Sequence, residues 1–279
     1  MSRPVRIEFP SAHYYVTSRG MNDKAVFRDT EDRAVFLNVL SGVVERFGWL
    51  VHSYVLLDSH YHLVLECPQA NLSKGMRQLN GVYTQHFNRR HEADGPLFQG
   101  RFHSVLFEAE EYLVPLCRHA VLNPVRLKLS GSAQQYRWSS HRAVAGQIQT
   151  PGFLHDEKLL GSFGKRPKDS QKKYRDYVKL DSGETSPLDA RCGQVLLGSA
   201  KFLAEMQPIL NGEKMAKRGP KRAQRRRSLP VLFKNVENKT RAERNALIRK
   251  AHIDHSYTLM EVGEFLGLHY TTVSKVVNR

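Results

Sequence analysis

Two extended apolar segments joined by a two-residue turn constrain the fold of this chain more than any other feature. Residues 50–57 (LVHSYVLL) and 60–67 (HYHLVLEC) are rich in aliphatic and aromatic side chains, and Asp58-Ser59 separates them. Runs of this kind on either side of a tight turn are typical of a β-hairpin. Pro68 follows the second run and ends its pairing, so the sequence predicts a hairpin over residues 50–67.

The hairpin stands within an ordered series of elements. Further strands are predicted at 13–18 and about 102–107, and apolar residues spaced by three and four predict helices over 31–47, 72–88 and 110–123. Pro124 is expected to limit the last helix. The order strand, helix, strand, strand, helix, strand, helix is that of a ferredoxin-like (RRM-like) α+β sandwich with an antiparallel sheet and one added helix.

The basic charge is concentrated in the second half of the chain. The whole chain has a net charge of +16. Residues 1–150 hold 17 basic and 13 acidic side chains, a net charge of +4, and the other 129 residues hold 26 basic and 14 acidic, a net charge of +12. Such an imbalance is typical of a surface or tail that binds a polyanion, although a solvated basic face is the simpler alternative. A membrane surface is a poor fit, because no apolar helix face accompanies the basic run.

Composition divides the chain into four parts. We expect a first domain over 1–150, a helical connecting region over 151–213, a basic linker over 214–230 and a helical module over 231–279. The linker contains KMAKRGPKRAQRRR, with eight basic residues and no acidic one.

Nothing in the sequence indicates a membrane span or a secreted protein. No apolar run approaches ~18 residues, and the first residues lack the apolar core of a signal peptide. Cys67, Cys117 and Cys192 are far apart and form no CxxC pair. We therefore expect reduced cysteines in a cytoplasmic protein.

A His-x-His pair in the second strand of the hairpin is the first candidate for chemistry. His60 and His62 are two residues apart, so both imidazoles leave the same face of the sheet. Two neutral imidazoles close together suit a divalent metal ion, although partly buried structural histidines are the commoner case.

A downstream helix offers a third ligand. His119 and Asn123 are four residues apart and share a helix face. If that face packs over the histidine strand, the Asn123 oxygen completes a metal site and His119 lies beside the metal-bound group. Asn123 also fits a role at the helix end before Pro124.

Several longer stretches resemble a known family. YVTSRG, FGWLVHSYVLLDSHYHLVLE, NLSKGMRQLNGVYTQHFNRRH, GPLFQGRFHS and EEYLVPLCRHAVLNPVR are similar, in this order, to the single-tyrosine HUH transposases of insertion sequences, and most of all to their REP-associated branch. The resemblance covers roughly residues 10–145. It implies an HUH transposase fold that cuts single-stranded DNA next to hairpins with Mg²⁺ or Mn²⁺, a metal site of His60, His62 and Asn123, and a helix tyrosine that attacks the scissile phosphate.

This chain departs from the family at the nucleophile, because His119 occupies the position of the tyrosine. An imidazole is shorter than a phenol and forms a labile phosphoramidate. The expected consequence is a transposase-like protein that binds DNA hairpins but cuts them poorly or not at all. One alternative is a non-catalytic, sequence-specific DNA-binding protein or transcriptional regulator. The other is a metal-dependent hydrolytic endonuclease in which His119 acts as nucleophile or as base for a metal-bound water.

Further polar residues in turns and at helix ends are candidates for contacts with DNA phosphates. In the first domain these are Arg19, Gly20, Asn88, Arg89, Arg90, Gln99, Arg101 and His103.

The last forty residues resemble a helix-turn-helix module. Gly267 separates helices that end near Phe265 and begin at Tyr270, and residues 239–252 supply a third helix. Tyr270, Thr271, Thr272 and Lys275 of the last helix are the candidates for duplex DNA contacts. A plain helical pair without a DNA role is the alternative. The oligomeric state is left open, with a homodimer as one candidate assembly.

Overall fold

The computed structural model describes residues 7–180, 186–193, 195–210, 228–253, 255, 257 and 259–277. The chain divides into two compact units, Met1–Lys214 and Met215–Arg279, and each is described by itself.

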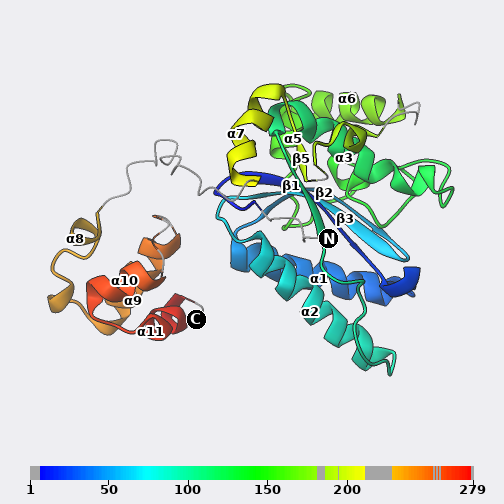
Figure 1. Cartoon of the computed structure of the whole chain (residues 1–279). Helices are drawn as coiled ribbons and strands as arrows, with labels where there is room; N and C mark the ends of the chain where they lie inside the picture. The colour runs from blue at the N-terminus through cyan, green and yellow to red at the C-terminus, as the bar shows by residue number, and fades with distance from the viewer. Residues whose placement is uncertain are drawn as a thin grey trace. The chain divides into compact units, whose positions relative to one another are not determined.

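A five-stranded sheet forms the centre of the N-terminal unit, in the order β2-β3-β1-β4-β5. The strands are β1 (Ala12–Arg19), β2 (Leu50–Leu57), β3 (His60–Cys67), β4 (His103–Phe107) and β5 (Leu196–Leu197). β1 to β4 pair antiparallel in the ferredoxin-like order, which confirms the predicted α+β sandwich (Figure 1). β5 pairs parallel with β4 and is an addition that the sequence did not predict.

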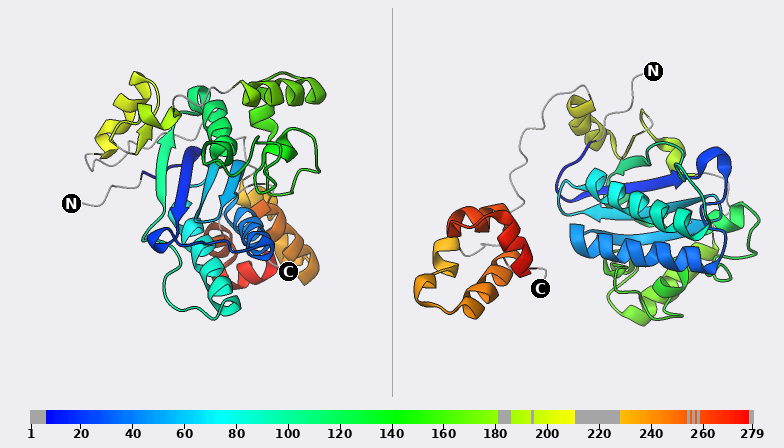
Figure 2. Two further views of the ribbon diagram at one scale, coloured as in Figure 1. Left: turned by 90° about the vertical axis from the view of Figure 1, so that its right-hand side faces the viewer. Right: turned by 90° about the horizontal axis from the view of Figure 1, so that it is seen from below.

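Two long helices, α1 (Thr30–Phe47) and α2 (Leu72–Arg90), cover one face of the sheet (Figures 1 and 2). α1 begins where the Asp29 carboxylate accepts a hydrogen bond from the Asp32 backbone N–H at 3.0 Å. It ends at Gly48, whose φ of 66° lies in the left-handed region that glycine tolerates best. The ends of α1 and α2 agree with the ends of the two predicted helices to within two residues.

The core beneath these helices is dense and aromatic. Tyr61 of β3 points into it, with its ring 4.6 Å from that of Phe36. Gly75 lets α2 approach the Trp49 indole, because a Cβ there would lie 2.0 Å from a ring atom. The Trp49 N–H donates to Asn71 Oδ1 at 2.9 Å, so the indole is held in place.

A third helix, α3 (Ala109–Arg126), packs on the opposite face of the sheet against β2 and β3 (Figure 1). It continues past its predicted end at Asn123 as far as Arg126. Pro124 has no N–H to offer the Ala120 carbonyl, and the Asn123 side-chain amide donates to that carbonyl at 3.3 Å instead. Because the carbonyl keeps a partner, the proline is accommodated in the last turn.

The residues after α3 add short elements over the same unit. These are α4 (His141–Val144), α5 (Glu157–Gly161), α6 (Pro167–Lys179), the 3-10 helix Pro187–Ala190, and α7 (Ala200–Leu210). Leu159, Tyr174 and Leu197 are buried in the same hydrophobic core as β1 to β4. The sequence predicted that the first domain ends at residue 150. The compact unit instead continues to Lys214 and includes the predicted connecting region.

The C-terminal unit is helical, as expected. It contains α8 (Leu229–Leu232), the 3-10 helix Val236–Asn238, α9 (Arg241–Ile253), α10 (Leu259–Leu266) and α11 (Tyr270–Val277). Phe233, Ile248, Val262 and Val273 belong to its own small core. Most of the predicted basic linker, up to residue 227, lies outside the described residues. No helix in the described part of the chain is long and apolar enough to cross a membrane.

Candidate active site on the α3 face of the sheet

The two histidines of the HYH sequence lie together on the α3 face of β3. Their ring centroids are 5.0 Å apart, and the two ring planes are nearly perpendicular. Tyr61 between them points to the opposite face, as the two-residue period of a strand requires. The predicted juxtaposition of His60 and His62 is therefore present in the fold.

A tyrosine that the sequence analysis did not select connects this pair to α3. The Tyr15 hydroxyl, on the neighbouring strand β1, lies 3.0 Å from Nδ1 of His62. The side chain of Asn123 is close enough to this hydroxyl to lower its pKa, against the effect of burial. Asn123 thus reaches the histidine pair through a phenol hydroxyl. The signal that could have revealed Tyr15 is alternation, since β1 pairs with β3 and Tyr15 shares a face with Thr17, the partner of His62.

His119 and Asn123 occupy the side of α3 that faces these residues. The His119 ring centroid lies 5.9 Å from that of Tyr15. The Asn123 amide nitrogen donates to the carbonyls of His119 and Ala120, at 3.0 and 3.3 Å. Because the nitrogen is occupied in this way, the Asn123 oxygen is the atom left for Tyr15 or for a cation.

The electrostatic surroundings keep both histidines of β3 neutral. Burial, followed by the nearby His60, His119, Arg126 and Arg19, holds the pKa of His62 well below its usual value. Burial and the positive charge of Arg19 also lower the pKa of His60. Neutral imidazoles keep a lone pair for a divalent cation at pH 7.

The donor set fits such an ion. Nε2 of His62 is buried and has no hydrogen-bond partner among the described residues, while Nδ1 contacts Tyr15. A metal-binding histidine commonly has one ring nitrogen held by a neighbouring polar group and the other directed at the ion. Burial raises the pKa of Tyr15, so its hydroxyl stays protonated and serves as a hydrogen-bonding group and not as an anionic nucleophile.

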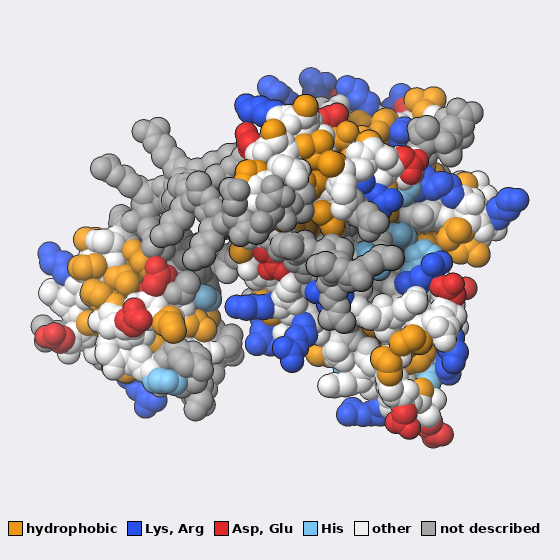
Figure 3. All heavy atoms as spheres, viewed as in Figure 1, with side chains coloured by type: hydrophobic (Ala, Val, Ile, Leu, Met, Phe, Trp, Pro, Cys, Tyr) orange, Lys and Arg blue, Asp and Glu red, His pale blue; other side chains and the backbone are white. Residues whose placement is uncertain are grey.

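The predicted DNA-contacting residues of the N-terminal unit have different surroundings. Arg89 and Arg101 are exposed. Arg19 is exposed and pairs with Asp23 at 2.6 Å. The Asn88 amide donates to the Gly95 carbonyl at 2.9 Å and holds the turn after α2. Figure 3 shows histidine, Lys and Arg side chains close together on the right-hand part of this unit.

Arg90 differs most from its predicted role. Its guanidinium pairs with the carboxylates of Asp29, Glu31 and Asp32 at 2.6 to 2.8 Å. These contacts tie the end of α2 to the start of α1 and neutralise the arginine. The structure therefore assigns Arg90 a structural contact, which the sequence pattern did not predict.

Of the predicted duplex contacts, Thr272 is exposed on α11. Tyr270, Thr271 and Lys275 belong to the same helix, and their side chains lie outside the described residues.

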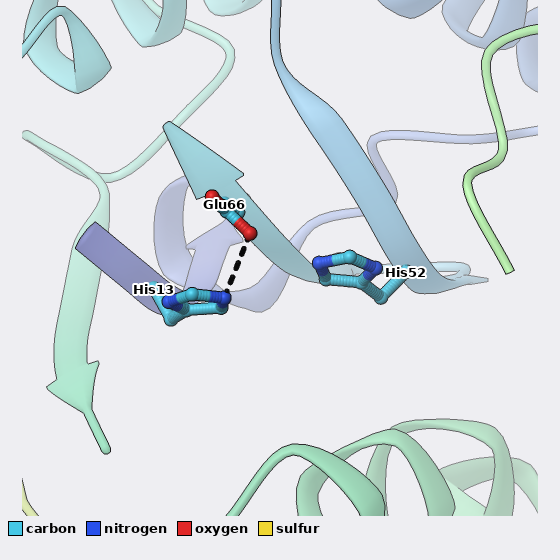
Figure 4. Close-up of side chains that lie close together, drawn as sticks. All are labelled: His13, His52 and Glu66. Carbon is cyan, nitrogen blue, oxygen red and sulfur yellow. Dashed lines mark ion pairs between the residues drawn. The ribbon is translucent and has the colours of Figure 1, made fainter. Parts of the chain in front are cut away.

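A second histidine cluster lies further along the same sheet face. Among the described residues, His13, His52 and Glu66 are the His, Cys, Asp or Glu side chains close enough to share one ion, with their ligand atoms all within 4.8 Å of one another (Figure 4). This cluster was not predicted from the sequence because its members come from three different strands.

The antiparallel four-strand order, the paired histidines and the overlying polar helix form an α+β domain with a candidate metal site on one face of its sheet. Residues 9–113 match the family model described as "Transposase IS200 like". The resemblance to insertion-sequence transposases is thus confirmed for this segment, which includes His60 and His62 and ends before His119 and Asn123. No curated protein matches the chain.

Two solved structures illustrate how far the likeness of fold extends. A REP-associated tyrosine transposase bound to a REP hairpin is similar with 18% identity and a TM-score of 0.45, over 53% of this chain and 88% of that one. The tRNA(His) guanylyltransferase of Saccharomyces cerevisiae is similar with 9% identity and a TM-score of 0.33, over 67% and 86% of the two chains. At these scores neither likeness adds to the family match.

Proposed function

We propose that this protein binds single-stranded DNA hairpins in the cytoplasm through its transposase-type domain, and that strand cleavage by the usual tyrosine route is lost because His119 replaces the nucleophile. The observation that carries the proposal is the convergence of His62, Tyr15, Asn123 and His119 on one sheet face. The family match over residues 9–113 supports the same class of substrate.

Each residue of this cluster has a distinct part in binding a phosphodiester. His60, His62 and the Asn123 oxygen would hold Mg²⁺ or Mn²⁺, which would polarise a non-bridging phosphate oxygen and offset the charge of the transition state. Tyr15 orients the His62 ring through Nδ1. Arg126 and Arg19 add positive charge near His62, as its lowered pKa reflects. This charge favours a bound phosphate.

The nature of His119 decides which products form. A tyrosine at this position would form an O–P bond while the P–O3′ bond breaks, and O3′ would leave with a proton as a free 3′-OH. An imidazole in the same role would form an N–P bond, which acid hydrolyses readily. We infer that neither adduct accumulates in the natural protein.

A hydrolytic nuclease is the second candidate, because His119 lies beside the Tyr15–His62 pair. In that case the His119 imidazole takes a proton from water, the water oxygen attacks phosphorus while the P–O3′ bond breaks, and the imidazolium returns a proton to the leaving O3′. The products are a 5′-phosphate and a 3′-OH.

The C-terminal unit would add duplex contacts. We propose that α11 enters a major groove with Tyr270, Thr271, Thr272 and Lys275 near the bases and phosphates. Thr272 is exposed, which supports this orientation. Phosphate attraction by the basic residues between 214 and 227 would make binding strongly salt-dependent.

One gel experiment separates these functions. A pool of hairpins with randomised stems and flanks is first selected for binding to the natural protein, and the winners are labelled at the 3′ end. They are then incubated with Mg²⁺ or Mn²⁺ and run on a neutral denaturing gel. We expect the natural protein to bind without cutting and His119→Tyr to form a protein-linked band that survives acid.

The controls assign each outcome. His60→Ala in the His119→Tyr background is expected to remove the linked band while hairpin binding persists. Free 5′-phosphate fragments from the natural protein would establish hydrolysis, and an acid-labile linked band would establish His119 as nucleophile. Absence of hairpin binding by the folded natural protein contradicts the proposal altogether.

A further inference from the structure

The second histidine cluster has the features of a built site, and it is independent of the function proposed above. His13 of β1 and Glu66 of β3 are direct cross-strand partners, and His13 Nε2 lies 2.9 Å from Glu66 Oε2. His52 comes from β2, where the pairing with β3 shifts between Val51 and Ser53. His52 is thus the extra residue of a bulge, a feature that re-aims a side chain. In Figure 4 the His52 ring lies beside the His13–Glu66 pair.

The buried His52 ring presents an unused lone pair. Its Nδ1 lies 2.9 Å from the His155 carbonyl, which can only accept, so Nδ1 carries the proton. Nε2 is therefore an acceptor, and it is buried without a hydrogen-bond partner among the described residues, in a residue with 0% exposure. An imidazole held by a backbone carbonyl on one nitrogen is the usual arrangement of a metal-binding histidine.

His155 itself is well placed to hold this orientation. Its backbone N–H donates to the carbonyl of Val51 at 2.7 Å, next to the bulge. The loop that presents the carbonyl and the strand that presents the imidazole are thus fixed to each other. A ring fixed in this way loses little freedom when it binds an ion.

A positive charge already sits at the cluster. The Lys158 ammonium lies 3.0 Å from Glu66 Oε2 and 2.6 Å from His13 Nε2. His13 Nε2 either donates to Glu66 or accepts from Lys158, and in the second case two acceptor atoms share one cation. Lys158 belongs to α5 and its side chain is 43% exposed, so it can withdraw into solvent. A divalent ion would then take its place.

The donor types select the class of metal. Two imidazole nitrogens and one carboxylate oxygen suit Zn²⁺ and its first-row neighbours better than Mg²⁺ or Ca²⁺, which prefer oxygen ligands alone. Three protein ligands leave a fourth position for water. We propose that His13, His52 and Glu66 form a second metal site, for a Zn²⁺-class divalent ion, that links β1, β2 and β3 at the end of the sheet opposite to His60 and His62.

The two sites are far enough apart to be studied separately. Glu66 lies four residues beyond His62 on the same strand, which corresponds to about 13 Å. A variant that lacks both His60 and His62 should therefore retain the second site. This background, His60→Ala with His62→Ala, is the one in which the test is made.

The test measures metal binding directly. The background protein is stripped with a chelator, and Zn²⁺ is titrated by calorimetry while Co²⁺ is followed by its visible absorption. We expect one equivalent of Zn²⁺ to bind and to raise the Tm. Adding His52→Gln or Glu66→Gln should weaken Zn²⁺ binding at least tenfold, and Lys158→Met should strengthen it.

His86→Gln is the matched control, because His86 is an exposed histidine of α2. It should leave the affinity unchanged. Circular dichroism of each metal-free variant checks that it is folded. If His52→Gln does not fold, Glu66→Gln still tests the site. If the background protein binds no Zn²⁺, or if folded Glu66→Gln and Lys158→Met bind it with unchanged affinity, the cluster is only an ion pair between Lys158 and Glu66 and the proposal is wrong.

Discussion

Replacing Tyr15 with phenylalanine tests the link between the histidine pair and α3. The change removes one hydroxyl that contacts two groups, His62 Nδ1 at 3.0 Å and the side chain of Asn123. A buried polar group left without a partner costs about 1 to 3 kcal/mol, so losing contacts to two groups should lower the free energy of unfolding by about 2 to 6 kcal/mol. Little volume is lost, so the cavity contribution is small.

Tyr14→Phe is the matched control for this prediction. Tyr14 is equally buried on the same strand, but its hydroxyl donates to a backbone group, the Ile7 carbonyl at 2.9 Å, and not to a histidine of the candidate site. By the same measure, the loss of this one contact should cost about 1 to 3 kcal/mol. Trp49 and Trp138 are the two tryptophans of the chain and both lie in the N-terminal unit, so urea unfolding followed by tryptophan fluorescence reports on that unit alone.

A second measurement on the same variant concerns the metal. If the Tyr15 hydroxyl fixes the His62 ring, Tyr15→Phe should weaken Mn²⁺ binding by about 10- to 100-fold, measured by titration with electron paramagnetic resonance. Equal stability losses for Tyr14→Phe and Tyr15→Phe, together with unchanged Mn²⁺ affinity, would refute the bridging role of Tyr15.

Three further outcomes are expected. Gly75→Ala should destabilise the N-terminal unit by about 1 to 3 kcal/mol in urea unfolding, since its Cβ would meet the Trp49 ring, whereas Gly81→Ala, which meets nothing within 4 Å, should not. Arg90→Ala should lower the Tm yet leave hairpin affinity in a filter-binding assay unchanged, because its charge is already paired; a large affinity loss would restore Arg90 as a DNA contact. Burial lowers the pKa of His141 to about 4, so the unfolded state takes up a proton at about pH 6.5 and the folded state does not. Stability should be full above pH 6.5 and fall by up to about 3 kcal/mol as the pH drops to 4, and His141→Gln should flatten that slope in unfolding measured at several pH values.

The fold of the first 126 residues was predictable because local patterns determine it. The hairpin turn at Asp58-Ser59, the three-and-four spacing of α1 and α2, and Gly48 at the end of α1 each act over a few residues. The fit of Asn123 beneath Pro124 was not predictable, since it depends on which carbonyl the proline leaves unpaired. The inclusion of the residues after 150 in the first compact unit was not predictable for a similar reason. Their elements are short, and β5 of two residues pairs with a strand about ninety residues earlier.

The site was predictable in part. Strand periodicity placed His60 and His62 on one face, and helix periodicity placed His119 and Asn123 together. Tyr15 and His13 were missed because the register between β1 and β3 decides which of their side chains meet, and one sequence does not encode that register in any local pattern. The ion pairs of Arg90 were not predictable because its carboxylate partners lie about sixty residues away at the start of α1.

The most direct measurement is a crystal structure of the protein soaked in Mn²⁺, with the ion located by its anomalous scattering. We expect a peak bound by His60 and His62, with the Asn123 oxygen among its ligands and the Tyr15 hydroxyl hydrogen-bonded to Nδ1 of His62. A fully occupied Mn²⁺ elsewhere and none at His60 and His62, with Asn123 turned away from them, would contradict it.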